Sequence, residues 1–150
     1  MAQDPSRPPP RLEDFPLRSH DKLRYGDTDR QGHVNNAVFS TFLETGRVEL
    51  VYAGGAALND PDCSYVIAHL GLDFIDELRW PGRVDIGTGV LAVGRSSITM
   101  DQALFQDGRL AARARTVIVQ VNQATHRSQS LSAALVEHLQ RLRMADAGGP

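Results

Sequence analysis

Residues 35–54 read NNAVFSTFLETGRVELVYAG, and this stretch predicts one long helix. Residues that can pack closely recur in it at three- and four-residue spacing, which places them on one helix face: Phe39, Phe42, Leu43, Gly46, Leu50 and Ala53. Asn35 or Asn36 can cap the N-terminus, because an asparagine oxygen accepts from an unpaired helix amide. Gly54-Gly55 can end the helix. At about 18 residues it would be roughly 27 Å long, so it predicts the central element of a small fold.

Strand patterns lie on both sides of this helix along the chain. A first strand is expected at 20–25, and four more are expected at 64–78, 83–93, 97–105 and 110–121. Asp107-Gly108 is a hairpin signal between the last two strands, and residues 131–144 predict a second amphipathic helix. We therefore expect an α+β fold in which a meander of about four strands forms one antiparallel sheet, with the long helix on its apolar face. Gly46, in mid-helix, would allow the helix to approach the sheet closely.

The composition is that of an ordinary globular domain. The chain has 150 residues, of which 41% are hydrophobic and 23% charged, and its net charge of −2 gives no general attraction to nucleic acids or anionic membranes. No stretch is long and apolar enough to predict a membrane span. Cys63 is the single cysteine, which excludes an internal disulfide framework and fits a reducing compartment. We expect one cytoplasmic domain that binds neither nucleic acid nor membrane.

The two ends of the chain are expected to lie outside this domain. Residues 1–17 predict a disordered or extended arm, because residues 1–16 hold five prolines and no apolar run. The arm has the features of neither a signal peptide nor a membrane anchor. Residues 18–144 predict a single domain, and residues 145–150 predict a flexible tail.

Residues 24–36, RYGDTDRQGHVNN, are the most unusual segment and lie between the first strand and the long helix. The segment holds two carboxylates, one imidazole and two asparagines. A helix N-terminus offers unpaired N–H groups and a partial positive charge, which can stabilise an oxyanion that forms on a carbonyl. A carboxylate beside that point can attack the carbonyl or activate water. Acyl transfer to water is therefore a coherent reaction for this segment.

Three other interpretations of the same residues stay open. The spacing from Asp27 to Gly32 resembles the start of a calcium loop, but Val38 stands where the closing glutamate belongs. Asp27, Asp29 and His33 are potential ligands of a transition metal, although no second histidine cluster lies nearby in the sequence. Aspartate and asparagine residues also turn chains and cap helices without any chemistry.

The segment 27–36 resembles the signature Asp-x-Asp-x-x-Gly-His-Val-Asn-Asn of hotdog-fold thioesterases of the 4-hydroxybenzoyl-CoA thioesterase type. As in that family, an aromatic residue and a glutamate follow on the helix, here Phe39 and Glu44. The resemblance extends over about residues 20–131 and includes the order of elements. It implies a hotdog fold, in which a curved antiparallel sheet of about five strands wraps one long central helix, plus a C-terminal helix. It also implies an acyl-CoA thioesterase that forms a homodimer or a dimer of dimers, with active sites at the dimer interface.

The resemblance further implies a role for each matching residue. Asp29 matches the catalytic carboxylate, which acts as a nucleophile or as a base for water. Asn36 matches the position whose main-chain N–H polarises the thioester carbonyl, and His33 matches a further polar residue of the catalytic group. The residues expected to contact the substrate are Asn35, Phe39 and Glu44, although Glu44 can instead pair with Arg47, three residues later on the helix. No metal or other cofactor is expected, because helix N–H groups can polarise the carbonyl.

The sequence departs from the family pattern at two places. Phe39 stands where many members have tyrosine, so any contact through a tyrosine hydroxyl is lost. Residues 125–127 read Thr-His-Arg, where Thr-Gly-Arg would be expected.

Two classes of function fit these residues. The first is an enzyme that hydrolyses an acyl-CoA or acyl-carrier-protein thioester, and the second is a non-catalytic acyl-CoA binding module on the same fold. Asp29 favours the enzyme, because a binding module has little need of a carboxylate beside the carbonyl. A hotdog enoyl-CoA hydratase fits less well, since the Asp-x-Asn-Pro-x-His pattern of those enzymes is not present.

Overall fold

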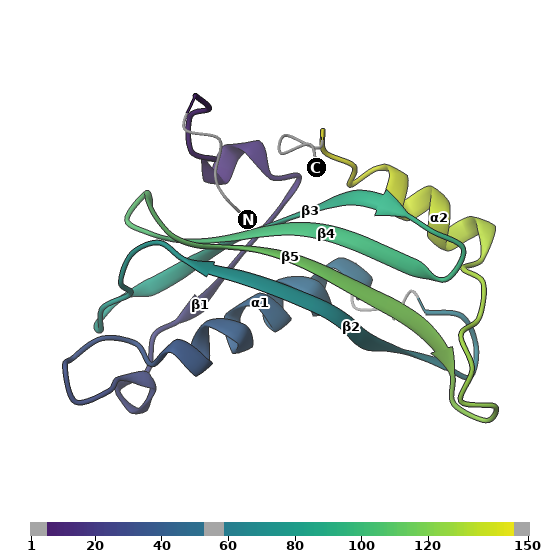
Figure 1. The fold of residues 1–150 in the computed structure, drawn as a ribbon, viewed down its shortest axis with the longest axis horizontal. Helices are drawn as coiled ribbons and strands as arrows, with labels where there is room; N and C mark the ends of the chain where they lie inside the picture. Colours follow the sequence, from purple (N-terminus) through teal and green to yellow (C-terminus); the bar gives the residue numbers. More distant parts are fainter. Residues whose placement is uncertain (1–5, 53–58, 146–150) are drawn as a thin grey trace.

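The computed structural model describes residues 6–52 and 59–145. In this part of the chain, one antiparallel sheet holds five strands in the order β1-β3-β4-β5-β2. The strands are β1, Leu17–Lys22; β2, Cys63–Phe74; β3, Arg83–Val93; β4, Ser97–Gln106; and β5, Arg109–Asn122. The helices are α1, Asn36–Val51, and α2, Ala133–Gln140, and 3-10 turns lie at Leu12–Asp14 and Tyr25–Asp27. The sheet curves round α1 (Figure 1), so the predicted hotdog architecture is confirmed.

The position of β2 differs from the expected meander. β2 pairs with β5, from Cys63 opposite Asn122 to Phe74 opposite Ala112, at the edge of the sheet far from β1. β3 pairs with β1 and β4, so the strand that follows α1 is not the neighbour of the next strand along the chain. Between β1 and β2, α1 runs across the concave face of the sheet (Figure 1). Residue alternation predicts where a strand lies but not which strand it pairs with.

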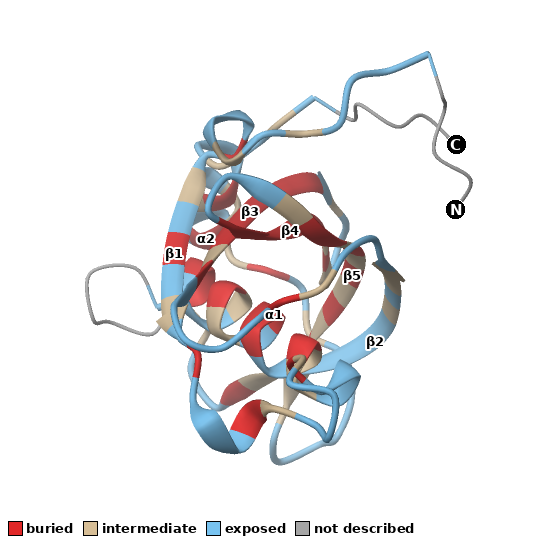
Figure 2. Ribbon diagram, turned by 90° about the vertical axis from the view of Figure 1, so that its left-hand side faces the viewer, coloured by how far each residue is buried: buried red, intermediate tan, exposed pale blue. Residues whose placement is uncertain are grey.

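One face of α1 packs into the curved sheet (Figure 2). Its buried residues are Phe39, Phe42, Leu43, Gly46, Leu50 and Val51. At Gly46 the helix approaches so closely that an added Cβ would lie 2.6 Å from Thr88 Oγ1 and 2.9 Å from Gln102 Nε2. The close approach predicted for this glycine is therefore confirmed. Ala53, Gly54 and Gly55, predicted at the end of the helix, lie outside the described residues.

The segment before β1 packs on the outer face of the sheet. Phe15 is buried together with Ala103 and Phe105, and its ring lies against Gly87, where an added Cβ would be 2.5 Å from the ring. Leu12 packs against the same cluster. This end of the expected arm, residues 12–16, is therefore ordered on the sheet instead of extending away from it.

The chain after α2 returns to the same outer face. The predicted helix 131–144 is shorter than expected and ends at Gln140. Val90 N–H donates to Leu142 O and Met144 N–H donates to Val90 O, both at 2.9 Å, so the chain runs along β3 beside Gly89. Phe15 and Met144, which lie near the two ends of the described chain, thus cover neighbouring parts of β3.

Candidate active site

The segment between β1 and α1 forms a compact loop. Thr28 and Val34 form an antiparallel bridge, and inside it Asp29 N–H donates to His33 O at 2.8 Å. Gly32 N–H donates to Asp29 O at 3.1 Å, and the φ of Gly32 is 80°, a left-handed conformation that glycine adopts at little cost. The sequence therefore folds back on itself between Asp29 and His33, which brings these two residues together.

The carboxylate of Asp29 is exposed and held by main-chain amides. Its Oδ1 accepts from Gln31 N–H at 2.8 Å and from His33 N–H at 3.3 Å. Its Oδ2 makes no hydrogen bond to any described residue. Asp29 thus has a fixed orientation and one oxygen open to water or to a substrate.

The carboxylate of Asp27 has the opposite environment. Asp27 is buried, its Oδ2 accepts from Arg24 N–H at 2.9 Å, and its Oδ1 accepts from Arg24 Nη2 at 2.8 Å. Burial raises the pKa of this carboxyl, but the hydrogen bonds and charge of Arg24 outweigh burial and lower it below the usual range. Its main-chain oxygen accepts from Asn35 N–H at 2.8 Å. Asp27 therefore ties the loop to the start of α1.

Asn35 caps α1, and Asn36 is its first residue. Asn35 Oδ1 accepts from Ala37 N–H at 3.0 Å, so Asn35 is the cap that the sequence left undecided between two asparagines. The exposed Asn36 has no acceptor for its main-chain N–H among the residues that the structure describes. Such an amide at a helix N-terminus can donate to an oxyanion.

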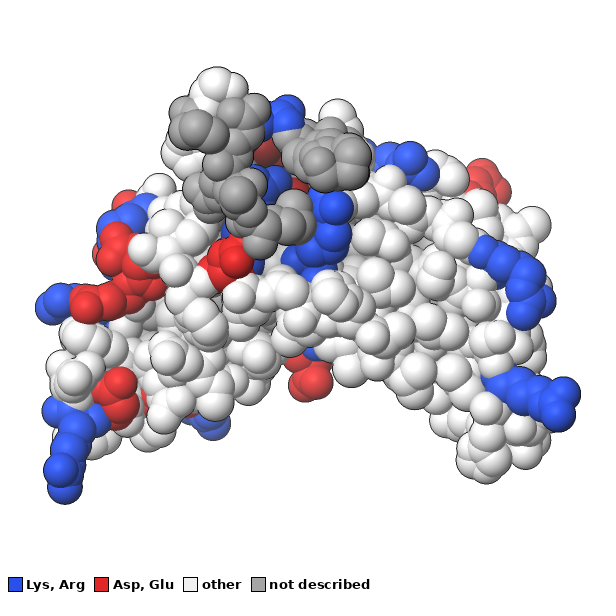
Figure 3. Space-filling view, viewed as in Figure 1, with Lys and Arg blue, Asp and Glu red and all other residues white. Residues whose placement is uncertain are grey.

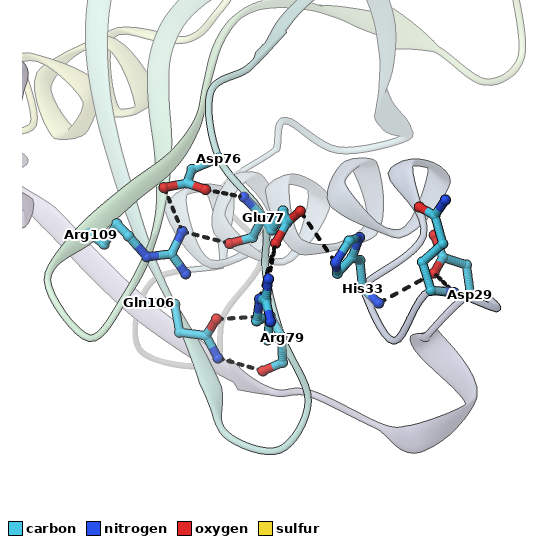
Figure 4. A network of polar contacts seen from close by, with 8 residues as sticks. Asp29, His33, Asp76, Glu77, Arg79, Gln106 and Arg109 are labelled. Atoms are coloured by element: carbon cyan, nitrogen blue, oxygen red, sulfur yellow. Dashed lines mark hydrogen bonds and ion pairs between the residues drawn. The ribbon is translucent and has the colours of Figure 1, made fainter.

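The imidazole of His33 contacts a residue that sequence reasoning missed. His33 Nε2 lies 3.2 Å from Glu77 Oε1, and Arg79 Nη2 lies 2.6 Å from Glu77 Oε2 (Figure 4). Glu77 belongs to the connection between β2 and β3, 44 residues after His33 in the chain. His33 and Arg79 also form an antiparallel bridge. Nothing in the local sequence indicates this contact, because the fold alone brings the two segments together.

Phe39 and Glu44, expected to contact the substrate, lie in different surroundings. Phe39 is buried in the core, and its ring meets the exposed ring of Phe74 edge-on, with centroids 5.1 Å apart. Glu44 lies eight residues after Asn36, or about 12 Å along the helix axis. With Val48 it lines a groove of about 520 Å³ between α1 and the start of β2. Within one chain, the Asp29 loop and Glu44 are therefore parts of different surfaces.

The residues that could hold a metal are dispersed or already paired. Of the three potential ligands named from the sequence, Asp27 is occupied by Arg24. Across residues 6–52 and 59–145, no group of three or more His, Cys, Asp or Glu side chains is placed to hold a metal ion. In the same residues, no helix has the length and apolar character needed to cross a bilayer.

The five-stranded antiparallel sheet wrapped round α1 defines a hotdog fold. The chain belongs to the Thioesterase-like superfamily, which matches residues 23–139. A search of curated proteins found no match.

Solved structures from several bacteria resemble this chain. The PA5185 protein from Pseudomonas aeruginosa has 26% sequence identity and a TM-score of 0.81, with 91% of this chain and 98% of that chain covered. A thioesterase from Thermus thermophilus, solved with coenzyme A and Zn, has 27% identity and a TM-score of 0.74, with 84% and 98% covered. DHNA-CoA thioesterase from Staphylococcus aureus, at 18% identity and a TM-score of 0.72 with 83% and 86% covered, is similar in fold.

Proposed function

We propose that this protein hydrolyses an acyl-CoA or acyl-carrier-protein thioester to a free acid and a thiol. One observation carries the proposal: the exposed carboxylate of Asp29 is held by two main-chain amides in the loop that leads directly to the open N–H of Asn36. We further propose that the protein is of the 4-hydroxybenzoyl-CoA thioesterase type, on the strength of residues 27–36.

In this mechanism the thioester carbonyl oxygen accepts from Asn36 N–H, where the helix dipole favours negative charge. Asp29 either takes a proton from water as the water oxygen bonds to the carbonyl carbon, or attacks that carbon and forms an anhydride that water then opens. In both cases the carbon–sulfur bond breaks and the sulfur leaves as a thiolate. The thiolate takes a proton from the protonated Asp29 in the first route and from water in the second. We assign His33 to the catalytic group and Asn35 to the border of the acyl group, whereas Phe39 is buried against the exposed ring of Phe74.

We propose that the substrate carries coenzyme A or the equivalent arm of a carrier protein. The Thermus thermophilus thioesterase, 27% identical, was solved with coenzyme A, which supports this class of substrate. No metal is expected to take part, because Asp29 and a helix amide supply the groups that the reaction needs. Hydrolysis should therefore persist after treatment with a chelator. Loss of activity on chelation and its return with a divalent ion would contradict this expectation.

We propose that the functional unit is a homodimer, or a dimer of such dimers, formed through β2. This strand is an edge of the sheet and is largely exposed (Figure 2). Its exposed apolar residues include Val66, Ile67 and Phe74, and the middle of the surface seen in Figure 3 is mainly uncharged, with charged side chains along its edges. An unpaired apolar edge strand tends to pair with another chain. A partner along β2 would also cover the groove beside Glu44.

The decisive experiment is a panel of acyl-CoA and acyl-carrier-protein thioesters, aliphatic and aromatic, assayed for release of free thiol. We expect at least one substrate to be hydrolysed with turnover, and a variant with Asp29→Asn to release thiol far more slowly. Binding of acyl-CoA, measured by calorimetry, without any release of thiol would favour the non-catalytic binding module instead.

A further inference from the structure

Glu77 is held in place more firmly than a surface glutamate requires. Arg79 donates to its Oε2 from both Nε, at 3.0 Å, and Nη2, at 2.6 Å. Its main-chain oxygen accepts from Arg109 Nη1 at 2.8 Å, and its main-chain N–H donates to Asp76 Oδ1 at 2.8 Å. Arg109 also pairs with Asp76 at 2.9 Å. Both the backbone and one carboxylate oxygen of Glu77 are therefore fixed.

The anchor of this arrangement is a buried glutamine. Gln106, at the end of β4, accepts from Arg79 N–H at 2.9 Å and donates to Arg79 O at 2.7 Å. The position of Arg79 is thus set by the sheet, and Arg79 in turn sets the orientation of the Glu77 carboxylate (Figure 4). With Oε2 engaged by Arg79, Oε1 is the oxygen directed at His33 Nε2.

Stability alone does not account for this network. The side chains of Glu77 and Arg79 are 41% and 66% exposed, and ion pairs at such positions contribute little to folding. The network does hold Glu77 Oε1 in place as a hydrogen-bond acceptor for His33 Nε2. A carboxylate can only accept a hydrogen bond, so Nε2 must carry hydrogen in both charge states of the ring. Nδ1 is then the one nitrogen of His33 that can gain or lose a proton.

We propose that Glu77 is a positioning residue that fixes the tautomer and orientation of His33 for thioester hydrolysis, with Arg79 holding Glu77. This inference rests on the proposed function and extends it, because it states which nitrogen of His33 exchanges protons at the site. Glu77 lies on the opposite side of His33 from Asp29 (Figure 4), so we infer that it acts through the imidazole and not on the reacting carbonyl. Carboxylate partners of this kind orient histidines at many reactive sites.

The test uses Glu77→Gln, which keeps the size of the side chain but offers only one oxygen. Arg79 can only donate, so the amide oxygen of the new side chain should turn to Arg79 and its NH₂ to His33. His33 Nε2 must then accept, and the hydrogen should move to Nδ1. We expect ¹⁵N spectra of the imidazole ring, recorded at about pH 9 so that neutral tautomers are observed, to show this exchange. The signals of His33 are assigned by their loss in His33→Gln.

Kinetics supply the second measurement. Glu77→Gln should lower kcat about tenfold, the scale of losing an outer partner of a reactive histidine, with KM nearly unchanged. In a chain that already carries His33→Gln, adding Glu77→Gln should lower kcat no further, because the residue acts through His33. Glu137→Gln, which removes one exposed carboxylate of α2 that pairs with Arg141, is the matched control and should leave both the tautomer of His33 and kcat unchanged.

Two results would overturn the inference. The first is an unchanged tautomer of His33 in Glu77→Gln. The second is that Glu77→Gln lowers kcat by the same factor in the wild-type chain and in the chain that carries His33→Gln. The spectra do not depend on activity. If the wild-type protein hydrolyses no thioester, the proposed function fails, and the tautomer still decides whether Glu77 positions His33.

Discussion

Asp27 and Asp29 lie two residues apart, yet their carboxylates have different environments. Asp27 is buried against Arg24 and ties the loop to α1, whereas Asp29 is exposed and its Oδ2 has no hydrogen-bond partner among the described residues. A reactive carboxylate needs access to the substrate, and a structural one needs saturated hydrogen bonds. The two aspartates can therefore be separated by experiment.

Asp29→Asn should lower kcat by about 10²-fold or more, the scale typical of losing a positioned base. The substitution keeps the size of the side chain and an oxygen for Gln31 N–H, so KM and the free energy of unfolding should change little. Steady-state kinetics on the best thioester of the panel provide the measurement. Near-normal turnover of this variant would show that another residue is the base.

Asp27→Asn should act mainly on stability. Because the folded-state pKa of Asp27 is lowered, its ionised form stabilises the protein above the unfolded pKa of about 4, and this contribution is lost as pH falls through the folded value. Urea unfolding should show the variant to be less stable than wild type at pH 7, with a difference that shrinks in acid. A difference independent of pH would argue against a charged Asp27–Arg24 pair.

The main-chain N–H of Asn36 can be removed without removing the helix. Asn36 is the first residue of α1, where proline is tolerated, and the preceding Asn35 has φ −58° and ψ 137°, a conformation that is compatible with a following proline. Asn36→Pro should therefore leave folding nearly intact but lower kcat by about 10²-fold, as expected for loss of an oxyanion donor. Asn36→Ala, which keeps the N–H, is the control. Equal effects of the two variants would exclude the proposed role of the amide.

At the scale of elements, Gly46 determines how closely α1 can lie on the sheet. Gly46→Ala would gain about 1 kcal/mol of helix propensity, but the new Cβ would overlap Thr88 and Gln102, and overpacking costs typically about 1–3 kcal/mol. We expect a net loss of stability of about 1 kcal/mol in urea unfolding. Gly26→Ala, whose Cβ would meet nothing within 4 Å, is the control. A more stable Gly46→Ala variant would mean that the helix has room to shift.

The elements differ in how well the sequence predicts them. The packed face of α1 and its mid-helix glycine were predicted, and its cap was narrowed to Asn35 or Asn36, because these are local features. The Asp107-Gly108 turn was also predicted. Its two residues have φ values of 51° and 78°, and a type I′ hairpin turn requires positive φ at both positions. The pairing of β2 with β5 and the contact of Glu77 with His33 were not predicted. Both depend on segments that are remote in sequence, and no local pattern encodes them.

At the scale of the whole molecule, the exposed edge at β2 predicts assembly. Light scattering at micromolar concentration should show a dimer or a tetramer. Ile67→Lys, which places a charge on the exposed apolar edge, should shift the protein towards monomer and lower its activity. Ala134→Lys, at an exposed site on α2, should change neither property. A wild-type monomer under these conditions would contradict the proposed interface.

The packing of Phe15 on Gly87 divides the N-terminal arm into two parts with different tolerance to deletion. Removing residues 1–11 should leave hydrolysis and stability unchanged, because Phe15 stays in place. Removing residues 1–16 should destabilise the protein by about 3–5 kcal/mol, the usual cost of losing a buried phenylalanine. Thermal unfolding of both truncated proteins checks this, and equal melting temperatures would mean that Phe15 contributes nothing.

The longer deletion also has a consequence for solubility. Phe15 covers Ala103 and Phe105 on the outer face of the sheet. Without Phe15, their apolar surface and the main chain at Gly87 would be exposed to water. Exposed apolar patches of this kind promote aggregation. The arm thus covers apolar surface on the outer face of the sheet. With this face covered, the self-association that we propose would be confined to the edge at β2.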